Sequence, residues 1–391
     1  MTSSGVRMAQ RAKQIEPFYV MKILQQAKEL EAQGRSIIHM EIGEPDFPSP
    51  DTVIMAGKQA LDDRLTQYTA ANGLPELRAA IAREYSEQAE IDPQRIVVTP
   101  GASGALQLVM AMLLDPADGI MMADPGYPCN RHIASLFSAD VQAVAVDEQS
   151  DYQLTAQLVD RNWRENTRTV LIASPSNPTG TLIPQQQLSA IYQLVQEKGG
   201  SLIVDEIYHG LVYDKQVSSA LSCGGHVFVI NSFSKFYGMT GWRIGWLVMP
   251  DTYIEVANRL AQNMFLAAPT ISQYAALAAM TMETRQELIR RRDIFHQRRD
   301  VLLPLIEQAG FKVRTRPEGA FYIYADCSSI SDDSMTLCAT LLYHGGVAVT
   351  PGADFGSNNS HQYVRFSYAN TIENLQQGMQ RIQQFISDRH E

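Results

Sequence analysis

A lysine, an arginine and two serines lie together in the short segment from Ser232 to Arg243. Lys235 follows one apolar run and precedes another, and we expect both runs to be buried strands. An ammonium held in a partly desolvated turn loses its proton more easily, and the neutral amine can attack a carbonyl. Arg243 and the hydroxyls of Ser232 and Ser234 are suited to a phosphate. A cofactor that carries both an aldehyde and a phosphate would use all of these groups.

The spacing Ser-x-Ser-Lys-x-x-x-Met-x-Gly-x-Arg resembles the signature of class I aminotransferases, which use pyridoxal 5′-phosphate (PLP) and have fold type I. The motif alone does not exclude a solvated loop lysine and an arginine stacked on Trp242. Further family landmarks follow in the family's order over roughly residues 15–385. The resemblance implies that Lys235 holds PLP as a Schiff base. Once displaced by the substrate amine, Lys235 would carry the proton from Cα to the cofactor's C4′.

A second glycine-rich turn, Gly101-Ala102-Ser103-Gly104, joins an apolar run at 96–98 to a predicted helix. The N–H groups and the dipole at a helix N-terminus attract anions, and Ser103 adds a hydroxyl donor. The turn has neither the Gly-x-Ser-x-Gly of a nucleophile elbow nor the Gly-x-Gly-x-x-Gly of a dinucleotide site. We therefore interpret it as a phosphate cradle, and it matches the Gly-Ala-x-x-Ala turn of the family.

Four further side chains follow predicted strands, and the resemblance gives each a place around the cofactor ring. Tyr127, in Asp-Pro-Gly-Tyr-Pro, would stack on the ring, although a structural turn explains this stretch equally well. Asn177, between two prolines, and Tyr208 would donate to the 3′-oxygen. Asp205 would keep the pyridine nitrogen protonated, so that the ring withdraws electrons as the Cα–H bond breaks. Because a nearby cation lowers a carboxylate pKa by roughly 1–3 units, we expect Asp205 to stay ionised.

The resemblance also implies the residues that meet the substrate and the partner subunit. Arg365, in Val-Arg-Phe-Ser on a predicted strand, would clamp the α-carboxylate, although a lone strand arginine is usually a charge at the rim. Gly43, in Gly-Glu-Pro-Asp-Phe, would let the backbone approach the substrate beside Asn177. Tyr68 would cross to the phosphate of the partner's cofactor. The implied enzyme is a homodimer with shared active sites.

The expected substrates are an L-amino acid and a 2-oxo acid, with a neutral or aromatic amino acid as the donor. Ser103 stands where one bacterial subgroup has a lysine for a second carboxylate, and the expected entrance offers Ile15, Phe18 and Tyr19 rather than a base. Burying a substrate carboxylate there without a partner would cost several kcal/mol. A PLP-dependent carbon–sulfur β-lyase on the same fold is the main alternative. A non-catalytic regulatory PLP protein is a more remote alternative. Such proteins usually carry a DNA-binding domain, for which we expect the short N-terminal arm to leave no room, and the intact Lys235 also argues against it.

The elements that position these residues alternate between apolar β-rich runs and helical stretches from Ile96 onward. This alternation predicts an α/β fold, with a mostly parallel sheet covered by helices on both faces. The motifs should then meet at the carboxyl ends of the strands. We expect an N-terminal arm and helix at 1–45, a large PLP-binding domain at 46–280 and a smaller α+β domain at 281–391. In the last part we expect a strand at 312–314, a structural role for Gly319-Ala-Phe-Tyr322, and a long helix whose basic segment at 290–299 forms a solvated face.

Composition excludes several other classes of protein. The chain has 391 residues and a formal charge of −10 without a long basic tract, which argues against nucleic-acid or anionic-membrane partners. The four cysteines show no metal-binding spacing, so we expect no metal site and no disulfide framework, as in a cytoplasmic protein. The start of the chain lacks the apolar region of a signal peptide, and no run is long enough to cross a bilayer.

Overall fold

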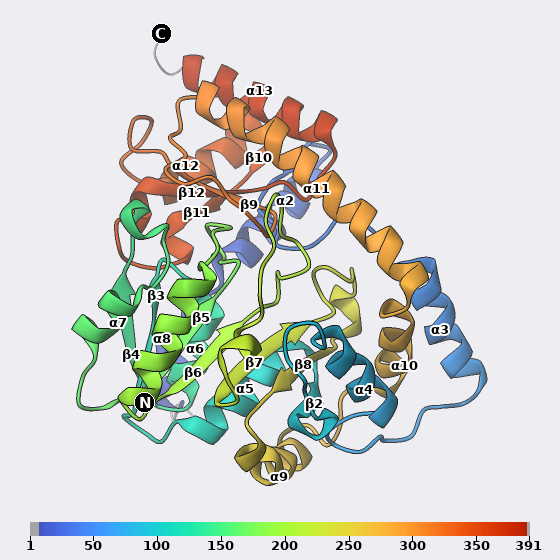
Figure 1. Ribbon diagram of the computed structural model, residues 1–391. Coiled ribbons are helices and arrows are strands. Elements are labelled where there is room, and N and C mark those ends of the chain that lie inside the picture. Colours follow the sequence, from blue (N-terminus) through green and yellow to red (C-terminus); the bar gives the residue numbers. More distant parts are fainter. Residues whose placement is uncertain (1–7, 389–391) are drawn as a thin grey trace, which may run out of the picture.

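The computed structural model describes residues 8–388, and a large sheet, a three-stranded sheet and a two-stranded pair organise it (Figure 1). The larger sheet has seven strands in the order β2-β8-β7-β6-β5-β3-β4. Its strands alternate with helices along the chain: β2 (Ile96–Thr99), β3 (Gly119–Asp124), β4 (Asp140–Ala145), β5 (Thr167–Ala173), β6 (Ser201–Asp205), β7 (Val227–Ser232) and β8 (Gly245–Val248). The prediction of an α/β fold is confirmed.

One strand breaks the parallel pattern. Strands β4, β3, β5, β6 and β7 are parallel neighbours, whereas β8 is antiparallel to both β7 and β2. A parallel return needs a crossover, usually a helix, but the segment between β7 and β8 contains only the 3₁₀ turn Thr240–Trp242. The chain therefore comes straight back beside β7, and Lys235 lies in this tight connection.

Successive side chains of the central strands enter two different cores. In β6, Leu202 and Val204 belong to one buried cluster and Ile203 to the other. Because strand side chains alternate between faces, each run of apolar residues feeds both sides of the sheet. One face is covered by α5 (Gly101–Leu113), α6 (Pro128–Leu136) and α9 (Ile254–Met264). The other is covered by α3 (Asp51–Asp62), α4 (Pro75–Glu84), α7 (Ala156–Asn162), α8 (Gln185–Glu197) and α10 (Thr270–Ala279).

The C-terminal part has its own sheet and its own core. Strands β11 (Thr350–Pro351), β12 (Tyr363–Ser367) and β9 (Tyr322–Asp326) form an antiparallel sheet. A parallel pair joins β1 (Ile38–His39) to β10 (Val347–Ala348), so a segment near the N-terminus belongs here. The remaining helices are α1 (Gln10–Gln14), α2 (Tyr19–Ala32), α11 (Met282–Gln308), α12 (Ser334–Thr340) and α13 (Ile372–Asp388). The strand expected at 312–314 is reduced to a single bridge between Lys312 and Asp326.

The long helix α11 connects the two parts, running from α10 beside the central sheet to α13 (Figure 1). Its basic segment was expected to be a solvated face. Two of its arginines are instead buried: Arg298 donates two hydrogen bonds to Asp46, and Arg299 pairs with Asp214. A guanidinium presents parallel N–H groups to a carboxylate, so these contacts fix the helix against loops of the central part.

One buried side-chain amide, that of Gln273, holds the loop that carries Tyr68. Gln273, in α10, accepts the N–H of Leu74 at 2.8 Å and donates to the Thr69 hydroxyl at 2.9 Å and the Ala268 carbonyl at 3.0 Å. The amide thus satisfies backbone groups that would otherwise be buried without partners. Tyr68 itself stays 81% exposed above this anchor. Among the helices of residues 8–388, none is long and apolar enough to cross a membrane.

Candidate active site

A cavity of about 410 Å³ opens where the carboxyl ends of the central strands face the C-terminal sheet. Most of the residues singled out from the sequence line it: Gly43, Ala102, Ser103, Tyr127, Asn177, Asp205, Tyr208, Ser234, Lys235, Arg243 and Arg365. They come from segments far apart in the chain. The parallel strands bring their carboxyl ends to one edge, which is where such folds place ligands.

Lys235 lies in the connection after β7 and is partly buried at the floor of this cavity. Its Nζ donates to the Gly43 carbonyl at 2.5 Å and lies 5.9 Å from the ring centroids of Tyr208 and Phe321. Desolvation lowers the pKa of Lys235 to about 8; Glu44 opposes this shift, while Arg365 and Arg243 add to it. The lowered pKa makes the neutral, nucleophilic amine accessible near neutral pH.

Asp205 ends β6 and is 6% exposed. Its Oδ1 accepts the N–H of Ile207 at 3.0 Å. Without the cofactor's ring nitrogen beside it, burial outweighs both this N–H and Lys235 and raises the pKa of Asp205 to about 6. The carboxyl still ionises below neutral pH, so a buried anion lies near the lysine. A protonated ring nitrogen would stabilise that anion further.

The phosphate end of the cavity combines the start of α5 with Arg243. Arg243 adopts a left-handed backbone conformation, with φ of 53°. A Cβ on Gly101 would lie 2.6 Å from Arg243 Nη2, so the glycine is needed for the arginine to reach the helix N-terminus. Ala102 and Ser103 line the cavity in the first turn of α5. Helix N–H groups, a hydroxyl and a guanidinium thus converge where an anion would bind.

Three of the expected residues lie outside this cavity. Gly101 supports Arg243 without lining the site. Ser232 is buried, and its hydroxyl contacts the Ile244 carbonyl at 3.0 Å and accepts the N–H of Ser234 at 3.0 Å. This contact fixes the turn, so Ser234 is the serine that faces the cavity. Tyr68 is absent from the lining, as expected of a residue that would act in a partner subunit.

The opposite end of the cavity holds a buried arginine. Arg365 donates from Nη1 to Asn177 Oδ1 at 2.9 Å and from Nη2 to the Glu41 carbonyl at 2.6 Å. Its guanidinium carbon lies 4.2 Å from the ring centroid of Tyr322 and 4.8 Å from that of Phe355. The arginine is 1% exposed, and its Nε has no protein partner. A cation fixed in this way suits a carboxylate.

Among the residues that line the cavity, Tyr322 was undervalued in the sequence and the side chains of α2 were missed. Tyr322 was assigned a structural role as part of Gly-Ala-Phe-Tyr, yet it lines the cavity and its hydroxyl lies 2.9 Å from that of Tyr208. Its place in β9, the strand paired with the strand of Arg365, was the available signal. Of the three residues expected at the entrance, Phe18 lines the cavity, whereas Ile15 and Tyr19 do not. Helix α2 supplies three further apolar side chains, Val20, Met21 and Leu24.

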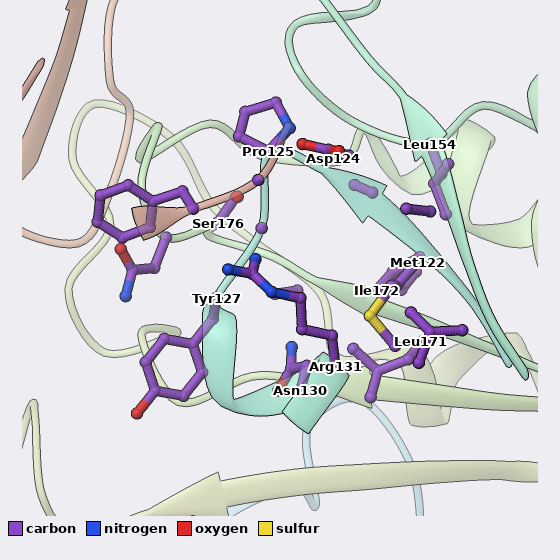
Figure 2. A pocket seen from close by; sticks show the side chains of 18 of the residues that line it. Met122, Asp124, Pro125, Tyr127, Asn130, Arg131, Leu154, Leu171, Ile172 and Ser176 are labelled. Carbon is purple, nitrogen blue, oxygen red and sulfur yellow. The ribbon is translucent and has the colours of Figure 1, made fainter. Parts of the chain in front are cut away.

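A smaller cavity of about 230 Å³ lies behind Tyr127 (Figure 2). Figure 2 shows Arg131 beside apolar side chains such as Ile172, while the Tyr127 ring points away from them. Arg131 donates from Nη2 to the Asp354 carbonyl at 2.9 Å. Because neither Lys235 nor another candidate acid or base for the reaction lines this space, we place the chemistry in the larger cavity.

The larger cavity fits PLP. The cofactor has an aldehyde, a phosphate, a hydroxyl oxygen on the ring (the 3′-oxygen) and a ring nitrogen. Each has a counterpart among the lining side chains, with Asn177 and Tyr208 for the 3′-oxygen. Lys235 offers an amine, Arg243 and the start of α5 form an anion site, and Asp205 offers a buried carboxylate. The close approach of Gly101 to Arg243 would be lost if a Cβ filled that space. The donor set therefore matches the cofactor group by group.

The lowered pKa of Lys235 predicts a distinct pH profile in the cofactor-free protein. An amine is neutral above its pKa, so Lys235 should react with an acylating reagent with a midpoint near pH 8. An ordinary lysine has a pKa of about 10.4 and remains protonated there. Peptide-resolved mass spectrometry of pulse-labelled protein between pH 6 and 11 measures both classes at once. A Lys235 midpoint above about pH 10 would contradict the desolvation argument.

Comparison with known proteins identifies the family of the chain. The family model "Aminotransferase class I and II" matches residues 35–382. The chain is 37% identical to the valine–pyruvate aminotransferase of Mycobacterium tuberculosis over 380 residues, covering 96% of this chain and 97% of that protein. It is also 37% identical to the (5-formylfuran-3-yl)methyl phosphate transaminase of Methanocaldococcus jannaschii over 385 residues, covering 97% of this chain and all of the relative.

Solved structures give the same result. An aminotransferase from Mycobacterium tuberculosis superposes with a TM-score of 0.95 at 36% identity, covering 98% of this chain and 100% of that chain. The aspartate aminotransferase of Thermus thermophilus with maleate has a TM-score of 0.92 at 31% identity, covering 97% and 100%. These relatives are transaminases, so the β-lyase alternative is not favoured. The chain belongs to the class I and II aminotransferase family and is a PLP-dependent aminotransferase of fold type I.

Proposed function

We propose that the protein uses the larger cavity to transfer an amino group between a neutral, apolar or aromatic L-amino acid and a 2-oxo acid, with Lys235 as the catalytic lysine. One observation carries this proposal: the cavity holds a lysine of lowered pKa between a buried carboxylate, Asp205, and a buried arginine, Arg365. The carboxylate suits the ring nitrogen of the cofactor, and the arginine suits a substrate carboxylate.

When bound, PLP supplies a sink for the electrons released at the substrate Cα. The role of Asp205 is to hold a proton on the ring nitrogen. Ser103, Ser234, Arg243 and the first N–H groups of α5 bind the phosphate, with Gly101 allowing their close approach. Asn177 and Tyr208 donate to the 3′-oxygen. Tyr127 covers one face of the ring, and its edge-to-face contact with Phe18 at 6.0 Å helps to hold it there.

Lys235 is the general base for the substrate Cα proton. Its pKa of about 8 lies near neutral pH, where a base both takes up and gives up a proton efficiently. Arg365 fixes the α-carboxylate, with Asn177 beside it and the backbone at Gly43 close by. Fixing this carboxylate orients the Cα–H bond toward the lysine amine. The apolar side chains of α2 exclude water from the side of the cavity that they cover.

The preference for a neutral donor rests on the lining of the cavity. The cations among its described residues are Lys235, Arg243 and Arg365, and each already has a role. A second substrate carboxylate would meet the apolar side chains of α2, without a further cation among the described residues that line the cavity. Its desolvation would cost several kcal/mol. An apolar or aromatic side chain instead gains about 25 cal/mol for each Å² that it buries.

We further propose a homodimer with shared active sites. Tyr68 is 81% exposed although its loop is anchored by Gln273, and Met55, Leu61 and Leu266 are each more than half exposed. An exposed tyrosine held on an anchored loop is suited to reach a second subunit. The partners are then a second copy of this chain and small-molecule substrates, with no role for nucleic acid or a membrane.

The division of the chain and its location complete the proposal. A separate buried cluster around β9, β12 and α13 supports a smaller domain at 281–391 beside the large domain at 46–280. The pairing of β1 with β10 supports an association of residues 1–45 with that smaller domain. All four cysteines are unpaired thiols, which suits the reducing cytoplasm.

Replacing the lysine tests the catalytic assignment. The Lys235→Ala variant should bind PLP without a covalent bond and lose turnover at least about 100-fold, because the general base is gone. In the native protein, borohydride should fix the cofactor to the peptide that contains Lys235, as mass spectrometry would show. Lys198→Ala, a change at the exposed residue that follows α8, is the matched control and should behave as the native protein does. A cofactor adduct on any other residue would refute the assignment.

Subunit mixing tests the shared site. Tyr68→Phe and Lys235→Ala chains, refolded together, should give heterodimers in which one site combines the unaltered Tyr68 with the unaltered Lys235. Activity should therefore exceed the sum for the two separate homodimers. Size-exclusion chromatography with light scattering establishes the dimer first. A monomeric protein with full activity would exclude this arrangement.

A panel of amino acids tests the donor preference. Rapid mixing of the holoenzyme with alanine, leucine, phenylalanine or aspartate gives single-turnover rate constants from the loss of cofactor absorbance. We expect leucine and phenylalanine to exceed aspartate by at least about tenfold per unit concentration, since the uncompensated carboxylate costs more than 1.4 kcal/mol. Arg365→Lys should slow all four donors alike, because they share the α-carboxylate. Aspartate as the fastest donor would overturn the preference but leave the aminotransferase assignment intact.

A further inference from the structure

We infer that Tyr322 is a positioning residue for both ends of the reaction site: its ring orients the Arg365 guanidinium, and its hydroxyl orients Tyr208. This inference deepens the proposed function and rests on the roles given there to Arg365 and Tyr208. The two contacts use different parts of one side chain, the aromatic face and the phenol oxygen. Substitutions can therefore separate them.

The ring contact arises from the register of the C-terminal sheet. In this antiparallel pair Tyr322 lies opposite Ser367, and Arg365 lies opposite Tyr324. Directly paired residues share a face, so Tyr322 and Arg365 are diagonal neighbours on one side of the sheet. The guanidinium carbon lies 4.2 Å from the Tyr322 ring centroid, closer than the 4.8 Å to Phe355. An arginine held between two rings loses little further freedom when it binds a carboxylate.

The hydroxyl contact joins this strand to the central sheet. The Tyr322 and Tyr208 oxygens are 2.9 Å apart, and both side chains are buried. A Cβ on Gly43 would lie 2.5 Å from the Tyr322 oxygen, so the glycine makes room for the hydroxyl as well as for the backbone near Lys235. Three separate segments thus meet at one phenol oxygen. A phenylalanine at this position would fill the same volume but leave Tyr208 without this partner.

The chemistry of a phenol determines which tyrosine donates the hydrogen bond between Tyr208 and Tyr322 when the cofactor is bound. Each tyrosine has one O–H to donate, and its oxygen can also accept. If Tyr208 donates to an acceptor in the cavity, Tyr322 is the neighbour that can donate to the Tyr208 oxygen. A donated hydrogen bond makes the receiving phenol a stronger donor, because chains of hydrogen bonds polarise one another. Tyr322 therefore strengthens the bond that Tyr208 makes to the 3′-oxygen of the cofactor.

The first measurement follows the hydroxyl. Donation to the 3′-oxygen competes with a proton on the Lys235 nitrogen, so a weaker donor lets that nitrogen keep its proton to higher pH. The absorbance of the bound cofactor reports this protonation. We expect Tyr322→Phe to move the spectral midpoint up by about 0.5 to 1 pH unit, the equivalent of one hydrogen bond. Tyr208→Phe should move it further in the same direction.

The second measurement follows the ring. The probe is 3-phenylpropanoate, which has a carboxylate and an apolar body but no amino group to react. Tyr322→Phe keeps the aromatic face and should bind the probe as the native protein does. Tyr322→Leu loses that face and should bind it about threefold to thirtyfold more weakly, the range of a cation–π contact. Calorimetry on the holoenzyme gives the dissociation constants.

A matched control lies two residues along the same strand. Tyr324 is buried and its hydroxyl has no protein partner, so Tyr324→Phe should change neither the spectral midpoint nor probe binding. The inference is overturned if Tyr322→Phe leaves the midpoint in place while Tyr208→Phe moves it. It is equally overturned if the phenylalanine and leucine variants weaken the probe to the same extent. If Tyr208→Phe and Arg365→Lys themselves have no effect, the failure belongs to the proposed function instead.

Discussion

The desolvation of one amine is the constraint on which the rest of the site depends. Lys235 lies where β7 ends, beneath aromatic rings and against a backbone carbonyl, and this environment lowers its pKa to about 8. The same burial raises the pKa of Asp205 to about 6. Between these two values the carboxyl of Asp205 is still ionised, while part of the Lys235 amine is already neutral. In water the amine would keep a pKa of about 10.4 and stay protonated near neutral pH.

The C-terminal sheet contributes what the central sheet lacks, a fixed cation for the substrate. Arg365 reaches across from β12 to Asn177 and to the Glu41 carbonyl, so both parts of the molecule hold it. Helix α11 fixes their relative position through Arg298 and Arg299, whose carboxylate partners lie in loops of the central part. Catalysis by orientation tolerates little movement between the reacting groups. The buried arginines of α11 are thus part of what keeps the cation opposite the lysine.

Much of the fold could be predicted from the sequence, because apolar runs of strand length alternate with helical stretches. The positions of the central strands follow from that pattern. The antiparallel direction of β8 did not, since it depends on a short connection and not on the composition of the strand. The expected strand near Lys312 is only one bridge, and two arginines expected in water are buried. Such details depend on distant partners such as Asp46, which no local pattern reveals.

The sequence by itself determined which chemical groups the protein has and that they lie on or just after strands: an amine at Lys235, an acid at Asp205 and a guanidinium at Arg365. The spacing of residues within a motif reveals these groups, because a local turn fixes which positions lie close together. Only the tertiary structure decided which groups meet. It directed the Ser232 hydroxyl toward a backbone carbonyl and Ser234 toward the cavity. It also placed Tyr322 in contact with both Arg365 and Tyr208. These outcomes depend on sheet register and burial, which bring together residues from separate segments, such as Tyr208 and Tyr322 at 114 positions apart.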